Sequence, residues 1–303
     1  MKILLFGKSG QVGWELQRSL LPLGELVALD FSSRELCGDF TRLDGVAETI
    51  RKIAPDVIVN AAAYTAVDKA ESEPEHVRTI NALAPAVLAS EAAKLGAWLV
   101  HYSTDYVFDG SGGKPWVETD PVGPLSVYGS TKLEGEEAIT ASGCHHLILR
   151  TSWVFAARGD NFAKKMLRLA QERDRLTVVD DQIGAPTGAD LLADVTAHAV
   201  RMALQRRDVA GLYHVVAAGE TSWWGYARFV LDFAWQAGIR LKVRPEDLVP
   251  VPASAFPSPA RRPKNSRLNT RKLENTFNLK LPPWQTGVTR MLTEILENQY
   301  DPA

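Results

Sequence analysis

The sequence predicts an α/β fold in which a parallel sheet is covered by helices on both faces. In the first half of the chain, short apolar segments alternate with longer segments of helical pattern. Continuous apolar strands are typical of a sheet that is buried on both faces, and the intervening helices make right-handed crossovers between parallel strands. After about Ser152 the alternation becomes less regular, which indicates a second, smaller α/β part.

The first half contains five segments with the short, nearly continuous apolar pattern of buried strands. In chain order we expect them at 2–6 (KILLF), 25–30 (ELVALD), 56–62 (DVIVNAA), 98–104 (WLVHYST) and 146–152 (HLILRTS). The segments between them mix apolar and polar residues at helical spacing, which predicts helices at 12–21, 45–53, 73–96 and 131–143.

The second half predicts fewer regular elements. Segments 175–188 and 211–216 have the pattern of further strands. The proline-rich segment 250–265 (PVPASAFPSPARRPKN) is expected to run extended over the surface. A last amphipathic helix is expected at 284–299.

Composition excludes several classes of function. The 303 residues suffice for one large or two modest domains with a substantial core, and 46% of them are apolar. The net charge of −2 gives no global positive field, so we expect no nucleic-acid partner. No apolar run approaches 18 residues, so no membrane span is expected. Only two cysteines and no signal-like segment favour a cytoplasmic protein.

A glycine-rich loop, FGKSGQVG, directly follows the first predicted strand. Its glycines, Gly7, Gly10 and Gly13, permit a tight turn, a close approach of a pyrophosphate to the backbone and close packing of helix on strand. The following helix, beginning near Gln11 and Val12, points free N–H groups at the phosphates. With a strand before it and a helix after it, this loop predicts dinucleotide binding on a Rossmann-type, doubly wound sheet.

The preferred nicotinamide cofactor stays open between NADH and NADPH. Asp30 ends the second strand, where a carboxylate can accept a hydrogen bond from the ribose 2′-hydroxyl of NAD. Ser32, Ser33 and Arg34 follow closely and could instead hold the 2′-phosphate of NADP.

Tyr128 and Lys132 are four residues apart, so they share one face of the expected helix. A phenol has a pKa near ~10, and a nearby ammonium lowers it; a value of about 7 would need roughly 4 kcal/mol of differential stabilisation. Such a tyrosine is an effective proton donor. Thr104 lies at the end of the preceding strand, where its hydroxyl can bond a substrate carbonyl oxygen. The three residues predict a catalytic set for carbonyl reduction.

The glycine spacing resembles the extended branch of the short-chain dehydrogenase/reductase superfamily. Nearly the whole chain resembles one family within it, the dTDP-4-dehydrorhamnose reductases. The resemblance rests on seven motifs: LLFGKSGQVGWEL, VIVNAAAYTAVDKAE, STDYVFDG, YGSTKLEGE, LRTSWVF, DQIGAPTGA and ARRPKNSRL. It implies hydride transfer from NADH or NADPH to C4 of dTDP-4-dehydro-L-rhamnose. The product, dTDP-L-rhamnose, serves cell-surface polysaccharide synthesis, including O-antigen.

The resemblance also assigns roles to individual residues. Tyr128 is implied to be the proton donor, and Lys132 is implied to bind the nicotinamide ribose and to tune the tyrosine. Contacts with the sugar are implied for Thr104, Asp105 and Trp153. Contacts with the cofactor are implied for Asp39, Phe40, Ala63, Tyr64 and Thr65, with a backbone contact expected at position 64.

Charged residues carry two further expectations. Arg261 and Arg262, in ARRPKNSR with Lys264 and Arg267, are expected to supply guanidinium groups for the substrate diphosphate. The resemblance also implies a Mg²⁺ site at a homodimer contact, at Glu15, Asp190 and Glu294. The histidines 101, 145, 146 and 214 show no metal-ligand spacing and are interpreted as structural or surface residues.

We expect an NAD(P)-binding domain at 1–152 plus about 172–216, and a substrate-binding domain at about 153–171 plus 217–303. Two alternative functions remain at this point. The chain could be another nucleotide-sugar reductase or epimerase. It could also be a non-catalytic binding module that resembles the regulatory subunit of methionine adenosyltransferase, although an intact Thr104, Tyr128 and Lys132 set disfavours this reading.

Overall fold

The computed structural model describes residues 1–297 and is built around a six-stranded sheet. All the strand pairs in this sheet are parallel, in the spatial order β10-β5-β4-β3-β1-β2. The strands are β1 (Lys2–Phe6), β2 (Glu25–Leu29), β3 (Val57–Asn60), β4 (Trp98–Thr104), β5 (His145–Thr151) and β10 (Gly211–His214). The predicted doubly wound α/β fold is thereby confirmed.

The first five strands form because their residues are apolar on both faces. Along β1, Ile3 and Leu5 join the core on one face of the sheet, whereas Leu4 and Phe6 join the core on the other. Successive side chains of a strand point to opposite faces of the sheet. A strand that alternated apolar and polar residues would therefore expose one face to solvent, whereas these strands bury both. The five predicted strands of the first half are confirmed: two have the predicted ends, and the ends of the other three differ by at most two residues.

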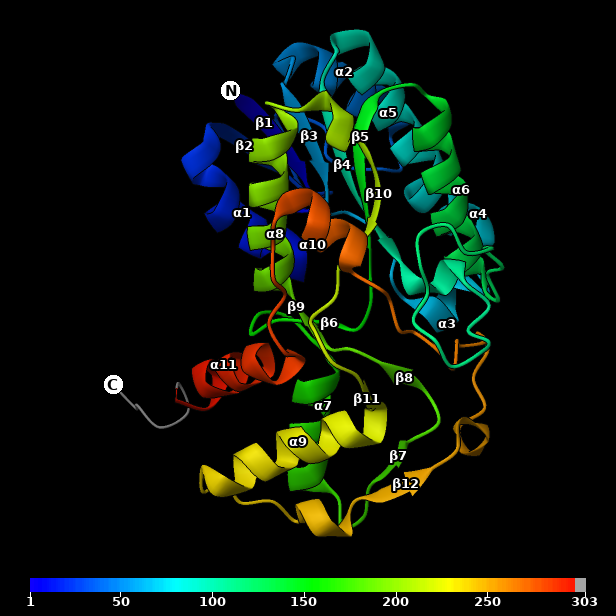
Figure 1. Ribbon diagram of the computed structural model, residues 1–303, viewed down its shortest axis with the longest axis vertical. Coiled ribbons are helices and arrows are strands. Elements are labelled where there is room, and N and C mark those ends of the chain that lie inside the picture. Colours follow the sequence, from blue (N-terminus) through cyan, green and yellow to red (C-terminus); the bar gives the residue numbers. More distant parts are fainter. Residues whose placement is uncertain (298–303) are drawn as a thin grey trace.

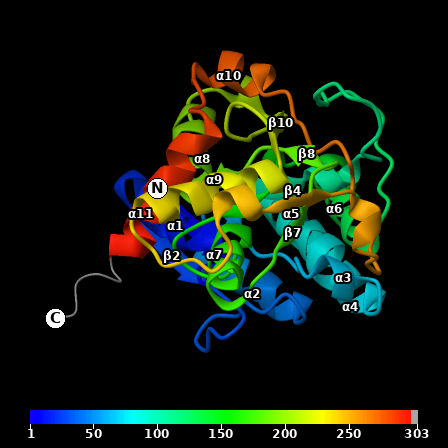
Figure 2. The same ribbon diagram turned by 90° about the horizontal axis from the view of Figure 1, so that it is seen from below.

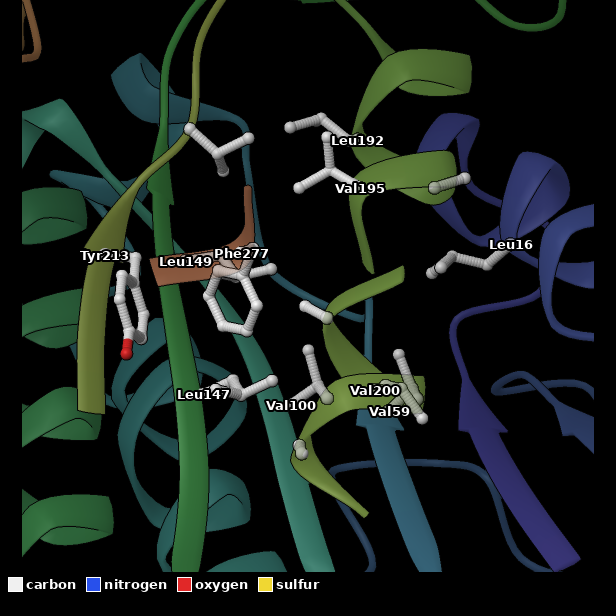
Figure 3. Close-up of a cluster of buried hydrophobic side chains, with 14 of the residues drawn as sticks. Leu16, Val59, Val100, Leu147, Leu149, Leu192, Val195, Val200, Tyr213 and Phe277 are labelled. Carbon is white, nitrogen blue, oxygen red and sulfur yellow. The ribbon is translucent and has the colours of Figure 1, made fainter. Parts of the chain in front are cut away.

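Helices cover both faces of the sheet (Figure 1). One face carries α1 (Gln11–Leu20), α8 (Ala189–Ala203) and α10 (Arg271–Phe277), and Figure 3 shows side chains of these helices packed on the strands. The other face carries α2 (Leu43–Ile53), α5 (Ala84–Leu95) and α6 (Val127–Ala141). The predicted helix 73–96 is divided into α4 (Pro74–Arg78), a π-helical turn (Thr79–Leu83) and α5.

A second group of elements lies at the carboxyl ends of the strands. It contains α7 (Phe162–Glu172), α9 (Trp223–Gln236) and α11 (Trp284–Glu297), which share a separate apolar core. Figure 2 shows α7 and α9 from this side, with α11 beside them. Side-chain caps start two of these helices, because Asn161 accepts a hydrogen bond from Lys164 N and Ser222 accepts one from Gly225 N. The last two residues of the predicted helix 284–299 lie outside the described residues.

Three short strand pairs complete this second group. They are β6 (Val154–Phe155) with β9 (Thr187–Gly188), β7 (Thr177–Val179) with β12 (Val249–Val251), and β8 (Ile183–Gly184) with β11 (Thr221–Ser222). The remaining elements are α3 (Val67–Ala70) and 3₁₀ turns at Leu21–Leu23, Asp105–Val107, Arg207–Val209, Pro245–Asp247 and Ala253–Ala255. The division into two domains stays a prediction; β7 and β8, within 172–216, pair with strands of the second group.

The strand order reverses at β1, which places a topological switch point between β1 and β3. The chain passes from β1 to β2 on one side and then returns to β3 on the other side of β1. Ligands of open α/β sheets bind at such a switch point, beyond the carboxyl ends of the strands. Within residues 1–297, no helix is both long and apolar enough to cross a bilayer.

Candidate functional site

The glycine loop between β1 and α1 is closely packed in a way that only glycine allows. Gly7 has φ +89°, and a Cβ there would lie 2.6 Å from Ala62 N. A Cβ on Gly13 would lie 1.9 Å from Gly7 O, whereas a Cβ on Gly10 would meet its nearest atom at an ordinary 3.4 Å. Gly7 and Gly13 are therefore needed so that neighbouring backbone segments can pack this closely. Gly10 leaves open space in front of the loop, which favours a ligand at that position.

This loop borders a cavity of about 400 Å³ beyond β1, β2 and β3. Residues predicted to bind cofactor that line it are Gly7, Gly10, Asp30, Asp39, Phe40 and Ala63. Helix α1 begins at its edge with no side-chain cap, so its first N–H groups remain available to an anion. The cavity thus has the loop, the helix terminus and the acidic strand end that a dinucleotide needs.

Asp30 is held by the two serines that follow it. Its Oδ1 accepts hydrogen bonds from Ser32 N at 3.1 Å, Ser32 Oγ at 2.8 Å and Ser33 Oγ at 3.3 Å. Burial acts to raise the pKa of Asp30, but the hydrogen bonds from Ser32, together with the nearby charge of Lys8 and a bond from Ser9, keep that pKa below its usual value. Both serines, which the sequence offers as holders of a 2′-phosphate, are therefore engaged with the carboxylate.

A second cavity, of about 450 Å³, adjoins the first and shares Gly10, Ala61 and Ala63 with it. It contains Thr104 from the end of β4 together with Tyr128 and Lys132 from the first turns of α6. Ser126 caps this helix by accepting a hydrogen bond from Gly129 N, so the helix starts where the tyrosine faces the cavity. Other predicted residues in its lining are Gln11, Val12, Thr65, Asp105 and Trp153.

Tyr128 and Lys132 share this cavity, but Lys132 does not lower the pKa of the phenol. Burial, opposed by a hydrogen bond with Thr104, raises the pKa of Tyr128 to about 12. Lys132 Nζ instead lies 2.6 Å from Tyr102 O and 3.1 Å from His101 Nε2. The prediction that Lys132 brings the pKa of Tyr128 towards neutrality is therefore wrong for this arrangement, because desolvation dominates.

Thr104 and Asp105 form the polar wall beside Tyr128. Thr104 Oγ1 donates to Asp105 Oδ1 at 3.1 Å and accepts from Tyr106 N at 3.2 Å. Asp105 is 2% exposed, and its Oδ2 has no hydrogen-bond partner. The hydroxyls of Ser103, Thr151 and Ser152 are likewise buried without partners, and all three residues line the same cavity. Buried polar groups are nearly always bonded, so this lining calls for a polar ligand.

Burial raises the pKa of Asp105 from 3.8 to about 6. Between these values the folded protein holds a proton that the unfolded chain releases, so stability falls as pH rises through this window. We expect Asp105→Asn to increase the free energy of unfolding above pH 6 and to flatten its pH dependence below, as measured by urea unfolding at a series of pH values.

The matched control is Asp109→Asn, four residues further on. A backbone hydrogen bond from Ser111 holds the pKa of Asp109 below its usual value, so this substitution should reduce stability at neutral pH. Equal effects of the two variants would contradict the burial argument.

Trp153 occupies a strained position between the two groups of elements. Its φ is +49°, a conformation that bulky side chains rarely adopt outside functional sites. Its ring stacks on Trp223 at 3.6 Å between centroids, and a Cβ on Gly184 would lie 2.7 Å from the indole. Trp223 lines the cavity as well, and the sequence analysis missed it because its apolar helix gives no separate signal.

The predicted arginines lie on a third and larger cavity of about 920 Å³, which shares Tyr106 and Trp223 with the second. Arg261 is exposed on its wall. Arg262 Nη2 donates to Asp68 Oδ2 at 2.6 Å, and this bond raises the pKa of the arginine above its usual value. The segment 250–265 lies mostly exposed on the surface, as expected; it begins in β12 and forms one wall of this cavity.

Two predicted cofactor-binding residues, Tyr64 and Gly13, do not line any of these three cavities in the described part of the chain. The Tyr64 phenol donates to Glu73 Oε2 at 2.9 Å. Its backbone is held at both ends by the buried Asn81, which accepts from Tyr64 N at 2.9 Å and donates to Tyr64 O at 3.1 Å. Asn81, which the sequence analysis missed, therefore fixes the cofactor-side loop after β3; its position inside an apolar helical segment was the available signal.

Glu15, Asp190 and Glu294 line one small cavity of about 180 Å³, together with two arginines. Arg18 Nε lies 3.6 Å from Glu15 Oε2, and Arg290 Nη1 lies 3.3 Å from Asp190 Oδ2. In the described part of the chain, no group of three acidic, histidine or cysteine residues is arranged to hold a metal ion. Glu15 and Asp190 thus each face an arginine within this chain, and the Mg²⁺ site expected at a homodimer contact stays a prediction.

Comparisons with known proteins place the chain among its relatives. The family described as "RmlD substrate binding domain" matches residues 1–297. The dTDP-4-dehydrorhamnose reductase of Escherichia coli strain K12 is 61% identical over 295 residues, which are 97% of this chain and 98% of that protein.

Two solved structures are similar over nearly their whole length. A dTDP-4-dehydrorhamnose reductase from Clostridium acetobutylicum has a TM-score of 0.87 and 36% identity, and the match covers 98% of this chain and all of that one. The same enzyme from Bacillus anthracis, in complex with NADP, has a TM-score of 0.86 and 32% identity, with 97% and 99% covered.

Proposed function

The chain belongs to the RmlD substrate binding domain family, and on this basis we propose that it is a dTDP-4-dehydrorhamnose reductase. The enzyme is an oxidoreductase that uses a nicotinamide cofactor to reduce the C4 ketone of dTDP-4-dehydro-L-rhamnose to dTDP-L-rhamnose. The observation that carries this proposal is the meeting of Thr104, Tyr128 and Lys132 in one cavity that adjoins the cavity of the glycine loop.

The residues of the second cavity divide the work of ketone reduction. A bound reduced nicotinamide supplies the hydride to C4. Thr104 Oγ1 bonds the carbonyl oxygen and so orients it towards Tyr128. The Tyr128 phenol transfers its proton to that oxygen as it becomes an alkoxide. Lys132 lies one helical turn away and would hold the cofactor ribose.

We assign the cofactor to the first two cavities. Asp30, Asp39 and Phe40 would hold its adenosine part, and Gly10 with the start of α1 would hold its pyrophosphate. Either NADH or NADPH can serve. The NADP complex of the Bacillus anthracis relative supports a site that accepts the phosphorylated form.

Two glycine substitutions separate cofactor binding from folding. We expect Gly10→Ala to leave stability nearly unchanged, because its Cβ meets only an ordinary contact, but to raise the Kd for NADPH at least about tenfold by blocking the pyrophosphate. Gly13→Ala, the comparison variant, should lower the free energy of unfolding by about 3 kcal/mol or more, since its Cβ overlaps Gly7 O. Fluorescence titration and urea unfolding measure the two effects, and loss of stability in Gly10→Ala would contradict the assignment.

The dTDP part of the substrate is assigned to the third cavity. Four cationic side chains line it, and Arg261 is the exposed guanidinium among them; the others are Lys165, Arg262 and Lys264. Diphosphates are well matched by guanidinium groups. Tyr106 and Trp223, shared with the second cavity, connect the diphosphate end to the sugar end, where Asp105 and Trp153 lie.

We expect Arg261→Ala to raise the KM for the dTDP-sugar roughly 10- to 100-fold, with a much smaller change in the KM for NADPH, because a charge-assisted bond to the diphosphate is lost. Arg240→Ala, at an exposed position that lines none of these cavities, is the control. Arg262→Ala should have the same direction of effect, but it also breaks the bond to Asp68. Unchanged kinetics in both cavity variants would remove the diphosphate assignment.

The function itself is tested by mixing the purified protein with dTDP-4-dehydro-L-rhamnose and following NADPH and NADH absorbance at steady state. Sustained oxidation with dTDP-L-rhamnose as product supports the reductase. A tightly held NAD with no net turnover would indicate an epimerase, and cofactor binding without turnover would indicate a binding module.

We also propose a cytoplasmic location, which the two free cysteines, Cys37 and Cys144, support. A homodimer is likewise proposed from the family resemblance, and equilibrium sedimentation tests it. A Mg²⁺ site at Glu15, Asp190 and Glu294 rests on the family resemblance alone, and within the described residues of one chain no group of three ligands is placed to hold a metal ion.

A further inference from the structure

A chain of three polar side chains runs through the sheet below the proposed catalytic cavity. Asn60 at the end of β3 and His101 of β4 are register partners on adjacent strands, which lie side by side in Figure 1. Asn60 Nδ2 lies 3.0 Å from His101 Nδ1, and His101 Nε2 lies 3.1 Å from Lys132 Nζ. Each of the three is at least 98% buried. Polar groups this deep in an apolar sheet are held by their mutual bonds.

The orientation of the Asn60 amide is fixed by the backbone. Its Oδ1 accepts a hydrogen bond from Ala62 N at 3.0 Å. If the amide were turned, its NH₂ group would face the Ala62 N–H, and two donors would oppose each other. The NH₂ group therefore faces His101 Nδ1 and donates to it, so Nδ1 carries no proton.

This bond determines which nitrogen of His101 holds the proton. Burial holds the pKa of His101 well below its usual value, so the imidazole is neutral and carries one N–H group. Since Nδ1 is an acceptor, the proton is on Nε2, directed at Lys132 Nζ. An ammonium has three donors and no acceptor, whereas a neutral amine has a lone pair that can accept. The arrangement therefore fits Lys132 as an amine that accepts from His101 and donates to Tyr102 O.

Other groups near Lys132 do not provide a competing acceptor in this position. Glu136, one turn further along α6, acts to raise the pKa of the lysine, but its carboxylate is bonded to Arg150 of β5. Burial still lowers the pKa of Lys132 to about 8. The other titratable side chains of its cavity are Tyr102, Asp105, Tyr106 and Tyr128, and the uncharged polar ones include Gln11, Thr65, Ser103, Thr104, Thr151 and Ser152.

We propose that His101 is a positioning residue that holds Lys132 as a neutral amine, away from Tyr128, until the lysine gains a proton. Protonation removes the lone pair that accepts from His101 Nε2–H. The ammonium then leaves His101 and turns towards the phenol and the cofactor ribose. His101 thus couples the charge of Lys132 to its place in the cavity. The catalytic consequence rests on the proposed function, whereas the location of the proton does not.

The sign of one pH shift tests this proposal. If His101 Nε2–H stabilises the neutral amine, then His101→Phe removes that support, and the alkaline limb of kcat should move up by about one pH unit. If His101 instead accepted from an ammonium, the same substitution would move the limb down. An absent or downward shift overturns the proposal. His145→Phe, which changes a histidine that stacks on Trp98 at the amino end of β4, is the control and should leave the profile unchanged.

A measurement on the unaltered protein decides the proton's location even if His101→Phe does not fold. In ¹⁵N-labelled protein, His101 should show a protonated Nε2 and an unprotonated Nδ1 at neutral pH. His214, which is equally buried, is an internal control with the opposite pattern, because its Nδ1 lies 3.1 Å from Trp116 O and must donate to it. A protonated Nδ1 on His101 overturns the proposal. Absence of NADPH oxidation by the wild type would instead count against the proposed function and leave this assignment standing.

Discussion

Tyr128→Phe is expected to lower kcat for the dTDP-sugar by about 10²- to 10⁴-fold while the Kd for NADPH changes little. The ring keeps its contact with Tyr106, at 5.4 Å between centroids, so the cavity is preserved and only the proton donor is lost. Steady-state NADPH oxidation gives kcat, and fluorescence titration gives the Kd.

The high pKa of this phenol is compatible with its role. Burial raises the pKa of Tyr128 to about 12, so the phenol keeps its proton throughout the neutral range. The alkoxide that forms on the substrate is a much stronger base than phenolate, so transfer remains favourable. An alkaline limb near the pKa of about 8 for Lys132 should therefore persist in variants that leave Tyr128, Lys132 and His101 in place.

The control for this experiment is Tyr213→Phe. The Tyr213 hydroxyl donates to Val209 O at 2.7 Å, on the strand β10 at the edge of the sheet. Tyr213→Phe removes a phenolic hydroxyl, as Tyr128→Phe does, but from a tyrosine that does not line the catalytic cavity. Turnover of Tyr128→Phe at the level of Tyr213→Phe would refute the proton-donor assignment.

Glu136→Ala is expected to lower the free energy of unfolding by about 3–5 kcal/mol. Glu136 of α6 forms two bonds with Arg150 of β5, Nε to Oε1 at 2.8 Å and Nη2 to Oε2 at 2.5 Å, and each side chain is 4% exposed. Removing the carboxylate leaves a guanidinium buried beside Phe108 without its counter-ion. Urea unfolding measures the loss.

Two further variants separate the buried charge from lost packing. Glu134→Ala, two residues earlier on the same helix, breaks an ion pair with Arg78 that is open to solvent, and it should change stability little. The double variant Glu136→Leu with Arg150→Met replaces the pair by apolar groups and should recover most of the loss. Equal destabilisation by Glu134→Ala and Glu136→Ala would contradict the role of burial.

Part of the fold and site could be predicted because their signals are local. The strand KILLF and the glycines that follow it are read from neighbouring residues, and Gly13 is required by an atom only six residues away, Gly7 O. Helical spacing likewise put Tyr128 and Lys132 on one face of α6, and both line the same cavity. The roles of these residues stay predictions until the variants are measured.

The features that the sequence analysis missed depend on contacts between distant segments. His101 was interpreted as structural, and its bond to Lys132 joins residues 31 positions apart. The stacking of Trp153 on Trp223 and the pairing of β7 with β12 join residues about 70 positions apart. A polar residue inside an apolar strand signals that some partner exists, but it does not say which one.

The sequence by itself therefore determined the layered α/β fold, the nucleotide loop and the identities of the proposed catalytic groups, since periodicity and short-range sterics act along a few residues of chain. Only the tertiary structure decided the protonation of those groups and their partners. Burial raises the pKa of Tyr128 and lowers that of Lys132, and burial is a property of everything that packs around a side chain, much of it far away in sequence.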